Sequence, residues 1–294
     1  RSEYTSIKEY YSVQQVSEEK NAQDITSHVP DYIPNGVYQI TANNNENILL
    51  ILTKGDQRAI YVYKYLFMNE QRVQASWSRW TFGGRVFGAF FAGSTLYVFL
   101  NRGGRHCLEK MNFTTYNTGD LSGEPYRVYL DSKKIATTAA YDDETKSTTF
   151  NISQEYSIPS TADIPSVGIV FPSGKYQEAK IEKGRATISG EYTTENITIG
   201  FPYRTHIRLS PIFIRSERNE RTETNLTGRL QLRYIRLNYA DTGGFCITVS
   251  YKNGRKCRYL MTARDITNLN SILGKVPRDT GVFKFPVQAQ NTDV

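Results

Sequence analysis

Short apolar runs separated by polar or glycine-containing breaks fill residues 48–113. Each run has the length of a β-strand, and many short strands at regular spacing are typical of a sandwich, a barrel or a propeller. Two successive meanders of this kind correspond to about two propeller blades of four strands each. The predicted strands cover residues 48–52, 59–65, 75–81, 85–91, 96–100 and 107–113.

Trp77 and Trp80 lie three residues apart in one of these predicted strands. On a strand this spacing places them on opposite faces. We expect one ring to enter the core and the other to cover a neighbouring sheet. A platform on which sugars stack is the alternative interpretation of the same two residues.

The pattern changes after residue 113, and we predict two domains. Residues 1–118 are expected to supply propeller blades. Residues 119–294 are expected to form a β-sandwich-like domain that returns to the main body near its end. Within this second part, residues 141–158 predict a polar turn followed by an alternating strand, and residues 215–227 predict a hydrophilic connection.

The composition favours the all-β class, because the chain contains 21 Tyr and 14 Phe and few helical apolar stripes. No apolar run is long enough to span a membrane, and the first residues lack the apolar core of a signal peptide. The three cysteines have no paired spacing. We therefore expect free thiols, with a bridge between Cys246 and Cys257 as the less favoured alternative.

Positive charge is concentrated in residues 201–264. This segment contains 11 Arg and 2 Lys against 3 Glu and 1 Asp, a net charge of +9, whereas the whole chain carries +7. Such a bias favours a polyanionic partner. A solvated strand face, with some arginines paired to nearby glutamates, is the alternative.

A strand over residues 228–239 would order these charges. Alternation places Arg229 and Arg233 on one face, with Leu232 and Tyr234 on the other. Paired strands of this kind present a ladder of guanidinium groups. Contact with a polyanion of any sequence needs only such positive charge.

Catalytic motifs are absent from the sequence. The histidines His28, His106 and His206 are far apart, and none belongs to a zinc-binding pattern. The acidic residues 142–144 are interpreted as a solvated turn, because a glycosidase needs two carboxylates held across a cleft. We predict a non-enzymatic protein with no cofactor and no metal.

Several segments resemble one protein family. KEYYSVQQVSEEKNAQDITSHVPDYIPNGVY, YVYKYLFMNEQRVQASWSRWTFG, LSGEPYRVYL and GRLQLRYIRLNY, in this order, are similar to the tail tubular protein B family, the tail nozzle proteins of short-tailed phages. The strongest segments are KYLFMNEQRVQASWSRW and DITSHVPDYIPNG, and residues 140–225 match least. The chain corresponds to the C-terminal part of a longer family protein.

The resemblance implies a structural virion protein, made in the host cytoplasm and placed in the distal part of the short tail. Family members combine a β-propeller with added β-domains, and six copies form a tube below the adaptor ring of tail tubular protein A. The implied partners are the adaptor ring, tail fibres, the bacterial envelope and double-stranded DNA in transit. Propeller blades from elsewhere in the longer family protein would complete a partial propeller.

We hypothesise that arginines of the basic segment line the DNA channel or a subunit interface. Because DNA must slide during ejection, its contacts are expected to be weak, independent of sequence and sensitive to salt. A polysaccharide hydrolase or a carbohydrate-binding component of the tail is the alternative function. The candidate residues are Arg204, Arg208, Arg229, Arg233 and Arg236.

Overall fold

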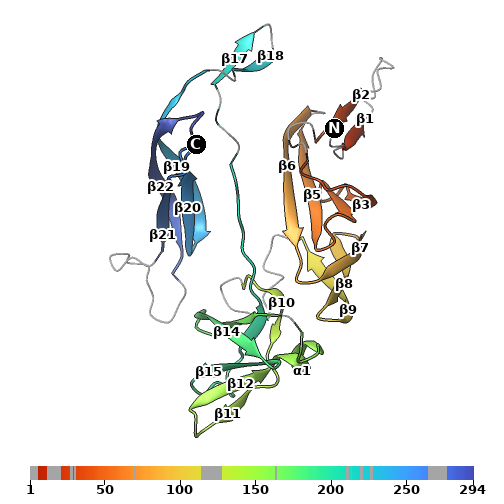
Figure 1. Ribbon diagram of the computed structural model, residues 1–294, viewed down its shortest axis with the longest axis vertical. Helices are drawn as coiled ribbons and strands as arrows, with labels where there is room; N and C mark the ends of the chain where they lie inside the picture. Colours follow the sequence, from red (N-terminus) through yellow and green to blue (C-terminus); the bar gives the residue numbers. More distant parts are fainter. Residues whose placement is uncertain are drawn as a thin grey trace. The chain divides into compact units, whose positions relative to one another are not determined.

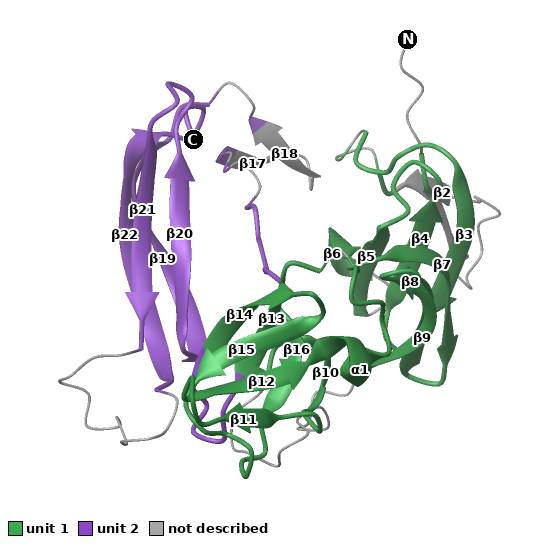
Figure 2. Cartoon of the chain, turned by 60° about the horizontal axis from the view of Figure 1, so that its bottom comes forward, with its two compact units in different colours: residues 1–169, 177–202 green, residues 170–176, 203–294 purple. Residues whose placement is uncertain are grey.

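The chain is nearly all β in its computed structural model, which confirms the predicted class (Figure 1). It divides into two compact units, residues 1–169 with 177–202 and residues 170–176 with 203–294 (Figure 2). The domain boundary predicted at residue 118 lies outside the described residues and stays a prediction. The structure describes residues 6–11, 21–26, 29, 31–68, 71–113, 128–162, 164–209, 212, 214–218, 221–225, 228–263 and 277–294.

The predicted meander forms two antiparallel sheets that curl into a half-barrel. All six predicted strands are present, each one to four residues longer than the apolar pattern alone indicates. A two-stranded sheet of β1 (Lys8–Tyr11) and β2 (Asn21–Asp24) precedes them. The four-stranded sheet contains β3 (Val37–Asn43), β4 (Ile48–Thr53), β5 (Ala59–Met68) and β6 (Gln71–Thr81). The three-stranded sheet contains β7 (Arg85–Ala92), β8 (Thr95–Arg102) and β9 (Arg105–Asn112).

Side chains join these two sheets where backbone pairing stops. The Gln39 amide donates to the Ala89 carbonyl over 2.6 Å and accepts from the Ala89 N–H over 3.2 Å, as a neighbouring strand would. Asn43 donates to the Gly93 carbonyl over 2.7 Å. Because residues of odd number on β3 share one face, Gln39 and Asn43 reach the same neighbouring segment and satisfy backbone groups at Ala89 and Gly93.

The half-barrel encloses one core and carries a second on its outer face. Fully buried aliphatic side chains from both sheets, such as Leu50, Val62 and Leu100, fill the inside. Ile51 and Tyr61 point the other way and pack under Ile33. Burial on both faces explains why β4 and β5 read as continuous apolar runs instead of alternating ones.

The rest of the first unit is built around a seven-stranded sheet with the order β10-β16-β13-β14-β15-β12-β11. The helix α1 (Ile152–Tyr156) follows β12 directly, so the strand predicted through residues 152–158 was wrong. The strands are β10 (Asp131–Ile135), β11 (Ala140–Asp142), β12 (Ser147–Asn151), β13 (Ser166–Val170), β14 (Tyr176–Glu182), β15 (Arg185–Ser189) and β16 (Thr198–Phe201).

The described residues of the second unit form three antiparallel ribbons. The first pairs β17 (Ile214–Arg218) with β18 (Arg221–Asn225), so the segment predicted as a hydrophilic connection contains a hairpin that was not predicted. The second pairs β19 (Gln231–Thr242) with β22 (Asp279–Gln290), and the third pairs β20 (Gly244–Ser250) with β21 (Lys256–Thr262). Apolar side chains of the last two ribbons, led by buried Val249, Phe285 and Val287, share one core.

Candidate cationic site on strands β19 and β22

A β-bulge interrupts the pairing of β19 with β22. Leu232 pairs with Ala289, but the next pair is Tyr234 with Pro286, so one residue of β19 stands opposite two of β22. Gln288, inside this bulge, has a left-handed backbone with φ of 52°. Bulges bend a strand and re-aim its side chains, and they are common beside functional sites.

The bulge changes which side chains share the outer face. Leu232 and Ile235 both pack into the core although they are three residues apart. Arg233 and Tyr234, between them, line one and the same hollow. The predicted placement of Tyr234 on the face opposite Arg233 was therefore wrong, because alternation shifts by one residue at the bulge.

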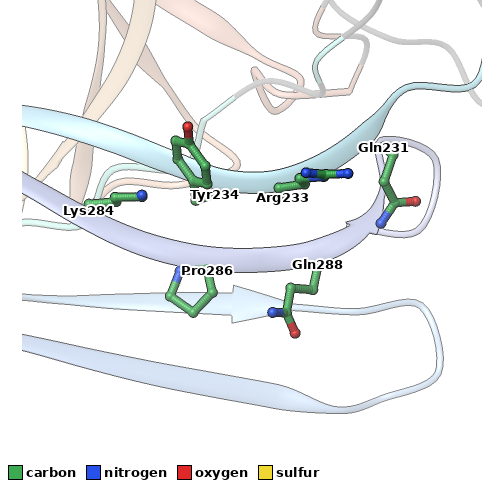
Figure 3. Close-up of a pocket in the computed structure, with 6 residues that line it drawn as sticks. All are labelled: Gln231, Arg233, Tyr234, Lys284, Pro286 and Gln288. Carbon is green, nitrogen blue, oxygen red and sulfur yellow. The ribbon is translucent and has the colours of Figure 1, made fainter.

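The hollow, which we call the bulge pocket, has a volume of about 530 Å³ (Figure 3). Two of its lining side chains are cations and two are amides, and none is acidic. Such a set donates hydrogen bonds and attracts anions. The lining residues are Gln231, Arg233, Tyr234, Lys284, Pro286 and Gln288.

Cations crowd around the tyrosine ring at this pocket. The Lys284 Nζ lies 3.8 Å from the ring centroid of Tyr234, and the Arg236 guanidinium lies 5.6 Å from it. Arg236 and Lys284 face each other directly across the two strands. Like charges in that position destabilise a ribbon, and the cation–π contacts with Tyr234 offset part of the repulsion. Among the described residues no ion pair with Arg233, Arg236 or Lys284 is found.

The other candidate arginines lie in the same unit outside the pocket. Arg204 and Arg208 are exposed in an extended segment, residues 203–209, that belongs to no strand. Polar and apolar residues alternate over residues 206–209, but alternation in sequence is not sufficient for strand pairing. Arg229 is exposed just before β19. The structure thus brings Arg233 and Arg236 to one face, whereas it does not place the other three with them.

Lys284, Pro286 and Gln288 line the pocket but were not predicted as site residues. Apolar alternation in VFKFPVQ points them outward, opposite Phe283, Phe285 and Val287, and this signal was readable. Their pairing with a strand some fifty residues earlier was not readable from either segment.

The two tryptophans lie on opposite faces of β6, as their spacing predicts. Trp80 packs against the inner core and stacks on Phe113, with ring centroids 5.9 Å apart. Trp77 packs against the outer core, and its indole N–H donates to the Ile25 carbonyl over 2.9 Å. Both rings are half-buried. These contacts give each ring a packing role, and sugar stacking stays a prediction.

The residues that could bind a metal ion or take part in catalysis do not come together in one site. Within the described part of the chain no group of three or more His, Cys, Asp or Glu side chains is arranged to hold a metal ion. His106 packs between Phe87 and Phe99, with centroids 5.4 and 5.7 Å away. All three cysteines are free thiols. Among the helices that the structure describes, none has the length and apolar character to cross a membrane.

The all-β fold and the cationic outer face define a structural β-protein with a surface suited to anions. The family model described as bacteriophage nozzle protein matches residues 1–294, and the chain belongs to that family. It is also 35% identical to the tail tubular protein gp12 of Escherichia phage T7 over 98% of the chain. The chain spans 37% of the length of that relative.

Family membership confirms the predicted class, a structural component of a phage tail and hence of the virion. Nothing in the fold or in these similarities favours the polysaccharide hydrolase alternative.

Proposed function

We propose that this chain forms part of the wall of a hexameric nozzle at the distal end of a short phage tail, which holds and then conducts DNA during ejection. The observation that carries the proposal is the family match over the entire chain, together with its similarity to a tail tubular protein. In this role the chain is not an enzyme and uses no cofactor.

The finer architecture belongs to the same proposal. Residues 1–118 contribute propeller blades, and the four-stranded meander β3–β6 has the strand number and order of one blade. Residues 119–294 add a β-sandwich-like domain. The adaptor ring of tail tubular protein A, the tail fibres and the bacterial envelope are the proposed neighbours of the nozzle.

Arg204, Arg208, Arg229, Arg233 and Arg236 are proposed to line the channel or a subunit interface. All five are exposed. Guanidinium groups that contact phosphates of any sequence release counterions on binding. Such contacts weaken steeply with salt and let DNA slide.

Electron microscopy of the full-length protein mixed with its adaptor ring tests the assembly. Six-fold tubes with this segment in the wall are expected. A protein that stays monomeric and never joins the adaptor, even at high concentration, would overturn the proposal.

DNA contact is tested separately by titrating a short duplex at several salt concentrations. If Arg233 and Arg236 contact phosphates, replacing both with Gln should lower the slope of log affinity against log salt by roughly 0.9 for each phosphate that an arginine no longer neutralises. Arg258→Gln, on strand β21 of the same unit, is the matched control. Equal slopes for all three proteins would remove these two residues from the DNA-binding surface.

A further inference from the structure

The positive charge of the bulge pocket is not balanced by any acidic side chain among the residues that line it. Arg233 and Lys284 supply this charge. Lys284 also lies directly opposite Arg236 across the two strands, where like charges destabilise the ribbon. A negatively charged partner would remove this repulsion, so the site is suited to a ligand that carries carboxylates or phosphates.

The same chain carries an exposed acidic turn whose negative charge is complementary to the positive charge of the bulge pocket. Strands β11 and β12 form a hairpin at the edge of the seven-stranded sheet, and its turn contains Asp142, Asp143 and Glu144. The Asp143 side chain is 83% exposed, and its ion-pair partner among the described residues is Lys146, which is itself 69% exposed. Glu144 is exposed as well.

Local hydrogen bonds give this turn a fixed shape. One carboxylate oxygen of Asp142 accepts from the Glu144 N–H over 3.0 Å, and the other accepts from the Thr145 hydroxyl over 2.8 Å. The Asp142 carboxylate therefore accepts hydrogen bonds within the turn, while the carboxylates of Asp143 and Glu144 are exposed to solvent. A turn that is already ordered loses little conformational entropy when it binds.

The turn also carries a concentrated negative potential. The pKa of the Tyr141 hydroxyl, beside it on β11, is raised by partial desolvation and then by the charges of Asp143, Glu191 and Asp142.

We propose that the acidic turn of one copy of this chain docks into the bulge pocket of a second copy, where Asp143 and Glu144 pair with Arg233 and Lys284. Guanidinium and ammonium groups bonded to carboxylates make strong, charge-assisted hydrogen bonds. The pocket volume lies within the range that encloses a compact ligand. This contact rests on the proposed function in that the chain must assemble with its own copies.

The geometry of such a contact has a structural consequence. The acidic turn and the bulge pocket are different surfaces. Each copy therefore inserts its turn into the pocket of one neighbour and binds the turn of another neighbour in its own pocket. Contacts of this head-to-tail kind generate closed rings when the rotation between copies closes. The inference therefore supplies a specific junction for a ring of identical subunits.

Charge exchange in the full-length protein tests the proposal. The first variant carries Asp143→Lys and Glu144→Lys, and the second carries Arg233→Glu and Lys284→Glu. Each variant alone should need at least about tenfold more protein for half-maximal assembly, because like charges then meet. Circular dichroism verifies that each variant is folded, and Glu182→Lys with Glu195→Lys is the matched control for added positive charge.

Mixing the two variants is the decisive step. The lysine turn of the first then meets the acidic pocket of the second, and the native turn of the second meets the native pocket of the first. Assembly, as measured by sedimentation velocity, should be restored in the mixture. A contact within one chain would not be restored by mixing, and that result would overturn the inference.

Three further outcomes separate this inference from the proposed function. If the wild type assembles and both folded variants assemble equally well, the junction is wrong and the nozzle proposal stands. If the pocket variant assembles normally but loses affinity for duplex DNA, the site serves DNA and the junction is also wrong. If the wild type does not assemble with itself or with its adaptor, both proposals fail.

Discussion

At the scale of single residues, one buried arginine joins two sheets of the first unit. The Arg102 side chain is 5% exposed and donates to Glu109 over 3.2 Å and to Asp131 over 2.8 Å. Its guanidinium also lies 4.8 Å from the ring centroid of Phe201. Breaking a buried ion pair leaves an unpaired charge and is costly.

We therefore expect Arg102→Gln to lower the free energy of unfolding by about 3–5 kcal/mol. Urea unfolding followed by tryptophan fluorescence measures this, because both tryptophans lie in the first unit. The control is Arg105→Gln, an exposed residue whose guanidinium donates to the Ser157 carbonyl over 3.1 Å across the same joint. Equal small decreases in both variants would show that Arg102 does not hold the joint.

Glu155 makes the stability of the first unit depend on pH. Burial acts to raise the pKa of its carboxyl, but the Lys134 ammonium 2.8 Å away and donors on Thr137 and Thr138 outweigh burial and hold the pKa below its usual value. Because the pKa is lower in the folded state, this stabilisation is present above the unfolded value of about 4.3 and is lost as pH falls through the folded value.

Glu155→Gln should accordingly cost roughly 3 kcal/mol at pH 7. The difference from wild type should begin to shrink as pH falls below the unfolded value of about 4.3 and should vanish below the lower folded value, where the wild-type carboxyl is neutral as well. Urea titrations at pH 7, 5 and 3.5 measure it, with exposed Glu182→Gln as the control. A difference that stays constant across this range would contradict the assignment.

At the scale of elements, α1 depends on the residue that precedes it. The Asn151 side chain accepts from the Gln154 N–H over 3.1 Å and caps the helix. Asn151→Ala should destabilise the first unit by about 1 kcal/mol, whereas Asn151→Asp should retain the cap. Chemical unfolding of the two variants gives the comparison, and equal destabilisation by both would assign Asn151 another role.

Apolar pattern was sufficient to predict the meander but not the elements that depend on distant contacts. The buried runs of β4 and β5 are continuous and unambiguous, so their strands were predictable. The helix α1 has a readable signal, an Asn followed three residues later by Gln, but it is short and lies inside an alternating pattern. Tyr234 was misplaced because a bulge in β22 decides its face, and no local feature of β19 carries that information.

At the scale of the whole molecule, charge and aromatic packing are distributed differently between the two units. The basic segment lies almost entirely in the second unit, and both tryptophans lie in the first. Arg233 and Arg236 could be predicted as members of one basic segment, but alternation places residues three apart on opposite faces, and only the bulge brings these two to the same face. Lys284 could not, because strand register across some fifty residues determines its position. The positive charge of the candidate site could thus be predicted from the sequence, whereas the pocket itself could not.

The division into two units predicts that they unfold separately. Phe285 is buried in the core of the second unit, and Phe285→Ala should destabilise that unit by about 3–5 kcal/mol. Far-UV circular dichroism should then show an early loss of signal while the midpoint of tryptophan fluorescence stays fixed. Leu50→Ala, in the core of the first unit, should move the fluorescence midpoint. If Phe285→Ala shifts both signals together, the two units unfold as one cooperative body, and a core in one stabilises the other.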